Sequence, residues 1–152
     1  MRRFLERGGD WVAGQLLLFA CLLVLSVLYP GTGPAAWRYA GVLVLIVAAA
    51  VAVAGVKALG RNLTPFPKPA DHAKLVQNGI YAKIRHPLYT AVILAGFGWA
   101  LLWLSWPALL VAVALLPFFH AKSCREEGFL RLKFPGYREY ETRTSRFIPW
   151  IY

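Results

Sequence analysis

Charged residues are scarce in this chain of 152 residues, because Asp, Glu, Lys and Arg together make up only 16% of it. Hydrophobic residues make up 59%, and the mean hydropathy is +0.52. A soluble domain ordinarily has roughly 25% charged and about 45–50% apolar residues. So much apolar surface does not fit into one water-soluble core, and the composition predicts an integral membrane protein.

Motifs of soluble enzymes are missing as well. No GxGxxG follows a strand-like run and no GxSxG is present, which argues against a Rossmann domain and a serine hydrolase. The three histidines, His72, His86 and His120, lack the HxxxH or ExxH spacing of helical metal ligands, so no metal site is predicted. The only two cysteines are Cys21 and Cys124, and we expect no structural disulfide between them.

Four apolar runs remain, and they account for most of the chain. A transmembrane helix needs roughly 20 apolar residues. We predict an all-α integral membrane protein with four transmembrane helices, at 11–29, 39–56, 88–104 and 106–119. The last run is only about 21 Å long at roughly 1.5 Å per residue, so we expect its helix to continue past His120 into the polar sequence that follows.

The basic residues indicate how these spans are oriented. Sixteen of the seventeen Lys and Arg residues fall on one side of the predicted membrane, and only Arg38 falls on the other. The positive-inside rule makes the richer side cytoplasmic, together with both termini and segments 57–87 and 120–152. A net charge of +10 on a membrane protein indicates contact with anionic lipids, and we expect no nucleic-acid partner.

The two predicted cytoplasmic segments carry strong signals for turns. Pro65, Pro67 and Pro69 favour an extended path in the connector between spans two and three, and Asn78-Gly79 marks a turn. Pro135-Gly136 should end the fourth helix before a short helix that carries Tyr137 and Tyr140. The apolar residues at 147–151 are expected to return to the membrane interface.

The sequence Arg85-His86-Pro87 stands at the start of span three. Proline suits the first helical position, which places His86 at the N-cap and leaves free backbone N–H groups facing the cytoplasm. Such a helix end can bind an anion, with His86 and Tyr89 as additional donors. The alternative is that Arg85 and Lys83 only anchor the helix at the lipid head groups.

Glu126 and Glu127 are two of only seven acidic residues in a basic chain. Lys122 lies one helical turn before Glu126, so both should share a helix face near the head groups. The alternative is that both acids are solvated on a surface helix. A carboxylate, an anion-binding helix end and tyrosine rings together suit a ligand with both a carboxylate and a cationic centre, a description that fits S-adenosylmethionine.

Several segments together resemble the isoprenylcysteine carboxyl methyltransferase family and are similar to the related phospholipid methyltransferases. The resemblance covers about 60% of the chain, from residue 59 onward. It rests on KLVQNGIY at 74–81, RHPLY at 85–89, the pair Glu126-Glu127 with Leu130 and Phe134, YREY at 137–140 and RFIP at 146–149.

This resemblance implies a single membrane methyltransferase domain over residues 1–152, which binds S-adenosylmethionine and methylates an amphiphilic or lipid acceptor arriving from the bilayer. The connector between spans two and three and the C-terminal helices would form the cofactor pocket. The resemblance assigns cofactor binding to Ala73, Lys74, Leu75, Val76, Tyr81, His86, Pro87, Leu88, Tyr89 and Glu126. Family members also use an upstream polar residue, for which Asn62 and Thr64 are both candidates.

The resemblance also points to residues that orient the acceptor. In the carboxyl methyltransferases an Arg one turn before the Glu meets the substrate carboxylate, and here Lys122 stands at that position with Arg125 nearby. Lysine lacks the bidentate fork of arginine, so the acceptor need not be a prenylcysteine carboxylate. A carboxylate acceptor would need no base, whereas an amine or thiol would need one, with Glu126, Glu127 and His86 as candidates.

Two other classes of protein are weighed against this interpretation. Sterol reductases share a similar C-terminal half and bind a nicotinamide dinucleotide, but typically carry Asn between the Pro and Tyr where this chain has Leu88. A non-enzymatic membrane scaffold or small transporter is the second alternative, although no span carries the buried charge of an ion path.

Overall fold

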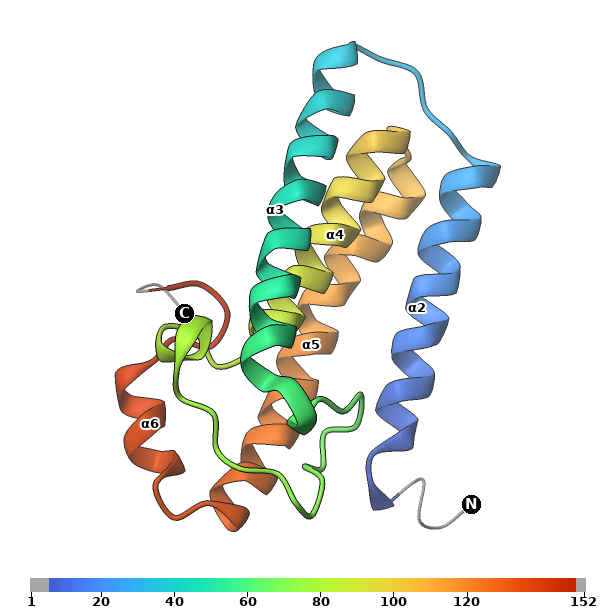
Figure 1. Cartoon of the computed structure of the whole chain (residues 1–152). Coiled ribbons are helices and arrows are strands. Elements are labelled where there is room, and N and C mark those ends of the chain that lie inside the picture. The colour runs from blue at the N-terminus through green and yellow to red at the C-terminus, as the bar shows by residue number, and fades with distance from the viewer. Residues whose placement is uncertain (1–5, 150–152) are drawn as a thin grey trace.

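The computed structural model describes residues 6–149, and within that range the chain is helical with no strand (Figure 1). A single isolated bridge joins Ile84 to Ser145. The all-α prediction is therefore confirmed. In chain order the elements are α2 (Gly9–Leu28), α3 (Ala35–Leu59), η1 (Gly60–Asn62), η2 (Gly79–Ala82), α4 (Pro87–Trp103), α5 (Trp106–Lys133) and α6 (Tyr137–Arg143).

Three helices are long and apolar enough to cross a membrane: α2, α3 together with η1, and α5. The fourth, α4, is apolar but has 17 residues, about 25 Å at roughly 1.5 Å per residue. The chain is thus a membrane protein, and the crossing by α4 stays a prediction. As expected, α5 continues past His120 and ends at Lys133, one residue before the sequence Phe134-Pro135-Gly136.

The helices α3 and α4 lie side by side because glycines let their backbones approach. A Cβ atom on Gly41 would stand 2.7 Å from the carbonyl oxygen of Gly98, and a Cβ on Gly98 would stand 3.0 Å from the Gly41 oxygen. In a membrane the hydrophobic effect does not drive helices together, so their association depends on close van der Waals packing, which small residues permit. This contact lies near the start of α3 and the end of α4, and Gly55 likewise admits Leu88 and Pro87 where the end of α3 meets the start of α4.

A short hairpin joins α4 to α5 at the end of the bundle that carries few charges. Leu104 adopts a left-handed backbone conformation with φ 53°, and the Ser105 side chain accepts a hydrogen bond from the Ala108 N–H. The guanidinium of Arg38 donates to the carbonyl oxygens of Leu102 and Gly31. Arg38, which stands apart from the other basic residues in the sequence, thus links the connection after α2 to the last turn of α4.

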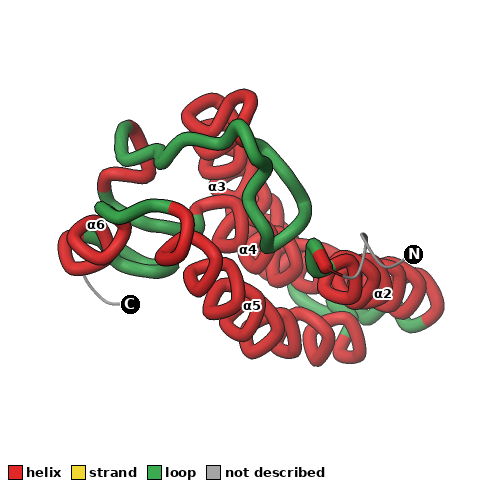
Figure 2. The backbone as a smooth tube through the Cα atoms, turned by 90° about the horizontal axis from the view of Figure 1, so that it is seen from below, coloured by secondary structure: helices red, strands yellow, loops and turns green. Residues whose placement is uncertain are grey.

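The helix α2 packs mainly beside α5 and lies apart from α6 at the opposite side of the molecule (Figure 2). The Trp99 indole donates to the Ser26 hydroxyl at 2.8 Å, and the rings of Trp11 and Phe118 lie 5.5 Å apart. These contacts attach α2 to the remaining helices near both of its ends.

The opposite end of the bundle carries the connector after α3 and residues 120–146, and we call it the basic end. No α-helix forms between η1 and α4, as the three prolines predict, and Gly79 begins η2 with a left-handed φ of 59°. The segment after α6 lies along the end of the connector, where the backbone N–H groups of Arg85 and His86 donate to the carbonyls of Ser145 and Arg146.

The C-terminal apolar strip is described only in part. Phe147 is buried in a cluster with Ile93, Leu115 and Phe119, in the core between α4 and α5. Ile148 is exposed, and Trp150 and Ile151 lie outside the described residues. The predicted return of this strip to the membrane interface stays a prediction.

Candidate functional site

A cavity opens at the basic end, between the connector, the start of α4, and helices α5 and α6. It contains about 750 Å³ of space outside the protein atoms, part of it open to solvent. Nine of the ten residues that the resemblance assigned to the cofactor line it: Ala73, Lys74, Leu75, Val76, Tyr81, His86, Leu88, Tyr89 and Glu126. The tenth, Pro87, is buried at the first position of α4, with His86 at the N-cap as predicted.

Glu126 and Tyr89 form a polar contact inside this cavity. The Tyr89 hydroxyl donates to Oε2 of Glu126 at 2.5 Å. The His86 ring stacks parallel to the Tyr89 ring, with the centroids 5.2 Å apart, and its Nδ1 lies 3.8 Å from the same carboxylate. The Glu126 side chain keeps 27% of its surface exposed, so a ligand in the cavity can reach its oxygens.

Glu127, the next residue, is fully buried and lies among Arg85, His86 and Arg146. Its carboxylate accepts hydrogen bonds from Arg85 at 3.0 Å, from Arg146 at 2.7 Å and from Nε2 of His86 at 3.1 Å. A buried carboxylate is tolerated only when paired and hydrogen-bonded in this way. Two alternatives are therefore wrong: Glu127 is not a solvated surface acid, and Arg85 is not a head-group anchor.

Asn62 fixes the wall of the cavity that the connector provides. Its side-chain amide donates to the Lys74 carbonyl at 3.1 Å, and its oxygen accepts from the Lys74 N–H at 3.2 Å. Thr64 also lines the cavity, and its hydroxyl accepts a local hydrogen bond from the Phe66 N–H at 3.3 Å. Of the two upstream candidates, Asn62 is the one that holds the segment 73–76 in place.

Tyrosines from η2 and α6 form another wall. The Tyr140 hydroxyl donates to the Tyr81 carbonyl at 2.7 Å. Burial raises the pKa of Tyr140 to about 12, with Arg85 opposing and Glu127 reinforcing the shift. Burial likewise raises the pKa values of Tyr81 and Tyr137, so all three phenols keep their protons at neutral pH.

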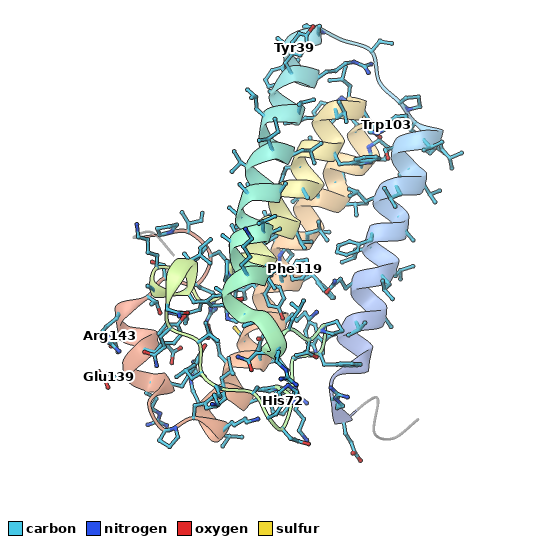
Figure 3. All side chains as sticks on the ribbon, viewed as in Figure 1. Tyr39, His72, Trp103, Phe119, Glu139 and Arg143 are labelled. Carbon is cyan, nitrogen blue, oxygen red and sulfur yellow. The ribbon has the colours of Figure 1, made fainter. Side chains whose placement is uncertain are left out.

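The α6 tyrosines were predicted to share a short helix but were not assigned to the site. Their i, i+3 spacing puts Tyr137 and Tyr140 on one face of α6, toward the cavity. Glu139 and Arg143 lie on the outer side of the same helix (Figure 3). The i, i+3 spacing of the two tyrosines was the feature of the sequence that could have indicated their shared place in the cavity wall.

Lys122 and Arg125, predicted to orient the acceptor, are not among the residues that line the cavity. Lys122 is 1% exposed, and its Nζ donates to Oε1 of Gln15 at 2.6 Å and to the Pro65 carbonyl at 3.1 Å. The same Nζ lies 5.3 Å from the centre of the Tyr89 ring. Arg125 is exposed and stacks on Phe129. Lys122 thus joins α2 to the connector beside the cavity.

Comparisons with known proteins agree with this architecture. The solved structure of a eukaryotic intramembrane Ras methyltransferase, isoprenylcysteine carboxyl methyltransferase, superposes with a TM-score of 0.68 at 18% sequence identity. The match covers 95% of this chain and 53% of that one, so the chain spans about half of that protein's length. No match was found among curated proteins.

A sequence-family comparison identifies the group. The family described as phospholipid methyltransferase matches residues 37–135, about two thirds of the chain, from the start of α3 to just beyond the end of α5. The matched region includes Glu126, Glu127 and the connector residues that line the cavity. The chain therefore belongs to the phospholipid methyltransferase family, with a fold like that of isoprenylcysteine carboxyl methyltransferase.

Proposed function

We propose that this protein is an S-adenosylmethionine-dependent methyltransferase that binds its cofactor in the cavity at the basic end and methylates an amphiphilic acceptor. Family membership and the membrane fold support methyl transfer. One observation supports the assignment of this cavity to the cofactor. Nine of the ten residues that the resemblance implies for cofactor binding line the cavity, although they come from segments far apart in the sequence.

The residues present fit this cofactor chemically. Glu126 offers a reachable carboxylate to the ammonium or sulfonium group, and the Tyr81 and Tyr89 rings add aromatic faces that attract a cation. Leu75 and Val76 supply apolar side chains for the nucleoside.

When bound, S-adenosylmethionine supplies an electrophilic methyl group, and the task of the protein is to hold donor and acceptor in line. Glu127 keeps the His86 ring in place, and that ring packs on Tyr89, which donates to Glu126. The polar groups that face the ligand are thus held before it binds. This rigidity suits a reaction driven mainly by positioning.

The need for a base depends on the acceptor. A carboxylate is already a nucleophile at neutral pH, whereas an amine or thiol must lose a proton. Of the three candidate bases, Glu126 combines partial exposure with a place in the cavity lining, while Glu127 is enclosed by its ion pairs. We assign proton removal from such an acceptor to Glu126.

The acceptor should be amphiphilic because the cavity lies at one end of long apolar helices. A lipid tail could remain beside α3, whose last residue Leu59 lines the cavity, as Leu88 does at the start of α4. The buried cation of Lys122 stands beside Tyr89, where it could orient an anionic head group, with Arg125 in a secondary role. Besides the acceptor, we expect membrane lipids to be partners of this protein.

Orientation and span number belong to the same proposal. The positive-inside rule places the basic end, with both chain termini, in the cytoplasm. That orientation requires an even number of crossings, so α4 would cross the bilayer together with α2, α3 and α5. The cofactor would then enter from the cytosol.

A calorimetric titration of the purified protein in detergent tests the proposed function. We expect saturable binding of S-adenosylhomocysteine and no binding of NADPH. Binding of NADPH alone would contradict the proposal in favour of a reductase. Binding of neither compound to folded protein would favour a non-enzymatic membrane role.

A further inference from the structure

The hydroxyl of Tyr137 is buried without a hydrogen-bond partner. Tyr137 is 1% exposed and lines the cavity. Among the side-chain nitrogen and oxygen atoms that are buried within residues 6–149, its Oη is the one that lacks a partner. Native proteins seldom leave a buried polar group unpaired, because the group has lost its hydrogen bonds to water.

Neighbouring hydroxyls on the same cavity do have partners. The Tyr140 hydroxyl donates to the Tyr81 carbonyl, and the Tyr89 hydroxyl donates to Glu126. The Tyr137 ring is held by other means: its backbone N–H donates to the Phe134 carbonyl at 3.0 Å, and its ring packs edge-on against Tyr140 with centroids 5.7 Å apart. The Tyr137 hydroxyl therefore does not serve to place its own ring.

Glu127 and Arg85, whose charges affect the Tyr137 phenol, already have hydrogen-bond partners. The oxygens of Glu127 accept from Arg85, His86 and Arg146. Arg85 donates in turn to the carbonyls of Glu141 and Thr144. The Tyr137 phenol keeps its proton at neutral pH, because burial raises its pKa, so it has a hydrogen bond to donate.

We propose that the Tyr137 hydroxyl donates a hydrogen bond to an acceptor atom of the cofactor bound in the cavity. This inference rests on the proposed function and adds one binding residue to it. Tyr137 lies beyond residue 135, where the match to the phospholipid methyltransferase family ends. It is also absent from the ten cofactor residues implied by the resemblance.

Three Tyr→Phe variants test this role, since each removes one oxygen atom and leaves the ring. Tyr137→Phe should weaken S-adenosylhomocysteine binding about tenfold, the loss of one hydrogen bond in a desolvated site. Its melting temperature without ligand should be unchanged or higher, because no internal hydrogen bond is lost. This combination separates a ligand contact from a structural role.

The other two variants are matched controls. Tyr140→Phe should lower the melting temperature of the ligand-free protein, because it removes the bond to the Tyr81 carbonyl. Tyr39, which is 70% exposed at the far end of the bundle, is labelled in Figure 3. Tyr39→Phe should change neither the melting temperature nor the affinity.

Several results would overturn the inference. One is wild-type affinity for S-adenosylhomocysteine in Tyr137→Phe. Another is a fall in its ligand-free melting temperature like that of Tyr140→Phe, which would mean that the hydroxyl bonds within the protein. An effect on the Michaelis constant of the acceptor alone would assign Tyr137 to the acceptor instead. If the wild-type protein bound no S-adenosylhomocysteine, the proposed function would fail together with this inference.

Discussion

His86 and Glu127 connect the start of α4 to α5, with Nε2 of the ring 3.1 Å from Oε1 of the carboxylate. Both side chains are buried, and the same carboxylate accepts from Arg85 and Arg146. The His86 ring packs against Tyr89, so this buried contact sets the position of a ring that lines the cavity. The packing of two helices and the shape of the candidate site therefore depend on one carboxylate.

Replacing Glu127 with Gln should destabilise the protein strongly. Removing one member of a buried ion pair typically costs about 3–5 kcal/mol, because it leaves buried charge uncompensated. Here Arg85 and Arg146 would lose their carboxylate. Thermal unfolding in detergent should show a clearly lower melting temperature than the wild type.

The matched control for this variant is Glu139→Gln. The Glu139 side chain is 76% exposed and pairs only loosely with Arg143, at 3.5 Å. Exposed ion pairs of this kind contribute little to stability. Equal melting temperatures for the two variants would contradict a structural role for Glu127.

Glu126→Gln should leave the fold intact and weaken cofactor binding. Glu126 is partly exposed in the cavity and its hydrogen bond comes from Tyr89, to which a glutamine amide oxygen can also bond. Loss of a charged partner costs about 1.5–3 kcal/mol, roughly tenfold to over a hundredfold in affinity. Calorimetry with S-adenosylhomocysteine measures the change, and wild-type affinity in a folded variant would disprove the assignment.

The adjacent residues Glu126 and Glu127 show which features of the site could be predicted from the sequence and which could not. The rarity of acidic residues drew attention to Glu126 and Glu127, of which Glu126 lines the cavity and Glu127 lies in a buried ion-pair cluster. Lys122, one turn earlier, donates to Gln15 and to the Pro65 carbonyl. Nothing in the sequence indicated that Glu127 would be enclosed by Arg146 from the segment after α6. Partners that meet only through tertiary packing have no local pattern to reveal them.

Helix ends could be predicted far better than such partners. Pro87 and Gly79 impose local backbone geometry, and the structure begins α4 and η2 at these residues. The contact between Lys122 and Gln15 joins residues 107 positions apart, and Gln15 lies within the predicted span 11–29 with no local pattern that indicates this partner. Local conformational rules act within a few residues, whereas the lining of the cavity draws on α3, the connector, α4, α5 and α6.

Asn62→Ala should weaken S-adenosylhomocysteine binding more than Thr64→Ala does. The alanine at 62 removes both hydrogen bonds to the Lys74 backbone and so loosens the connector wall of the cavity. The alanine at 64 removes one local bond to the Phe66 N–H. Hydrogen exchange at the Lys74 amide should accelerate in the first variant only, and the reverse order of effects would favour Thr64 as the cofactor residue.

The stability of the protein should fall as the pH rises above about 10. An unfolded tyrosine loses its proton near pH 10, whereas the folded pKa of Tyr140 is about 12. Between these values the folded state binds more protons than the unfolded state, so raising the pH favours unfolding. Melting temperatures measured from pH 9 to 11 should decline less steeply in Tyr140→Phe, and identical slopes would contradict the raised pKa.

Lys122 should contribute to acceptor binding through its charge. Lys122→Ala is expected to raise the Michaelis constant of an amphiphilic acceptor or lower turnover, with cofactor affinity nearly unchanged, and Lys122→Arg should retain much activity. The Lys122 amine also donates to Gln15 and the Pro65 carbonyl, so loss of activity in Lys122→Ala could arise from displacement of α2.

The control variant Gln15→Ala separates the two effects, because it removes one anchor and keeps the cation. Normal acceptor kinetics in Gln15→Ala alongside impaired kinetics in Lys122→Ala would support orientation by charge. Equal impairment in both variants would show that Lys122 acts by anchoring α2.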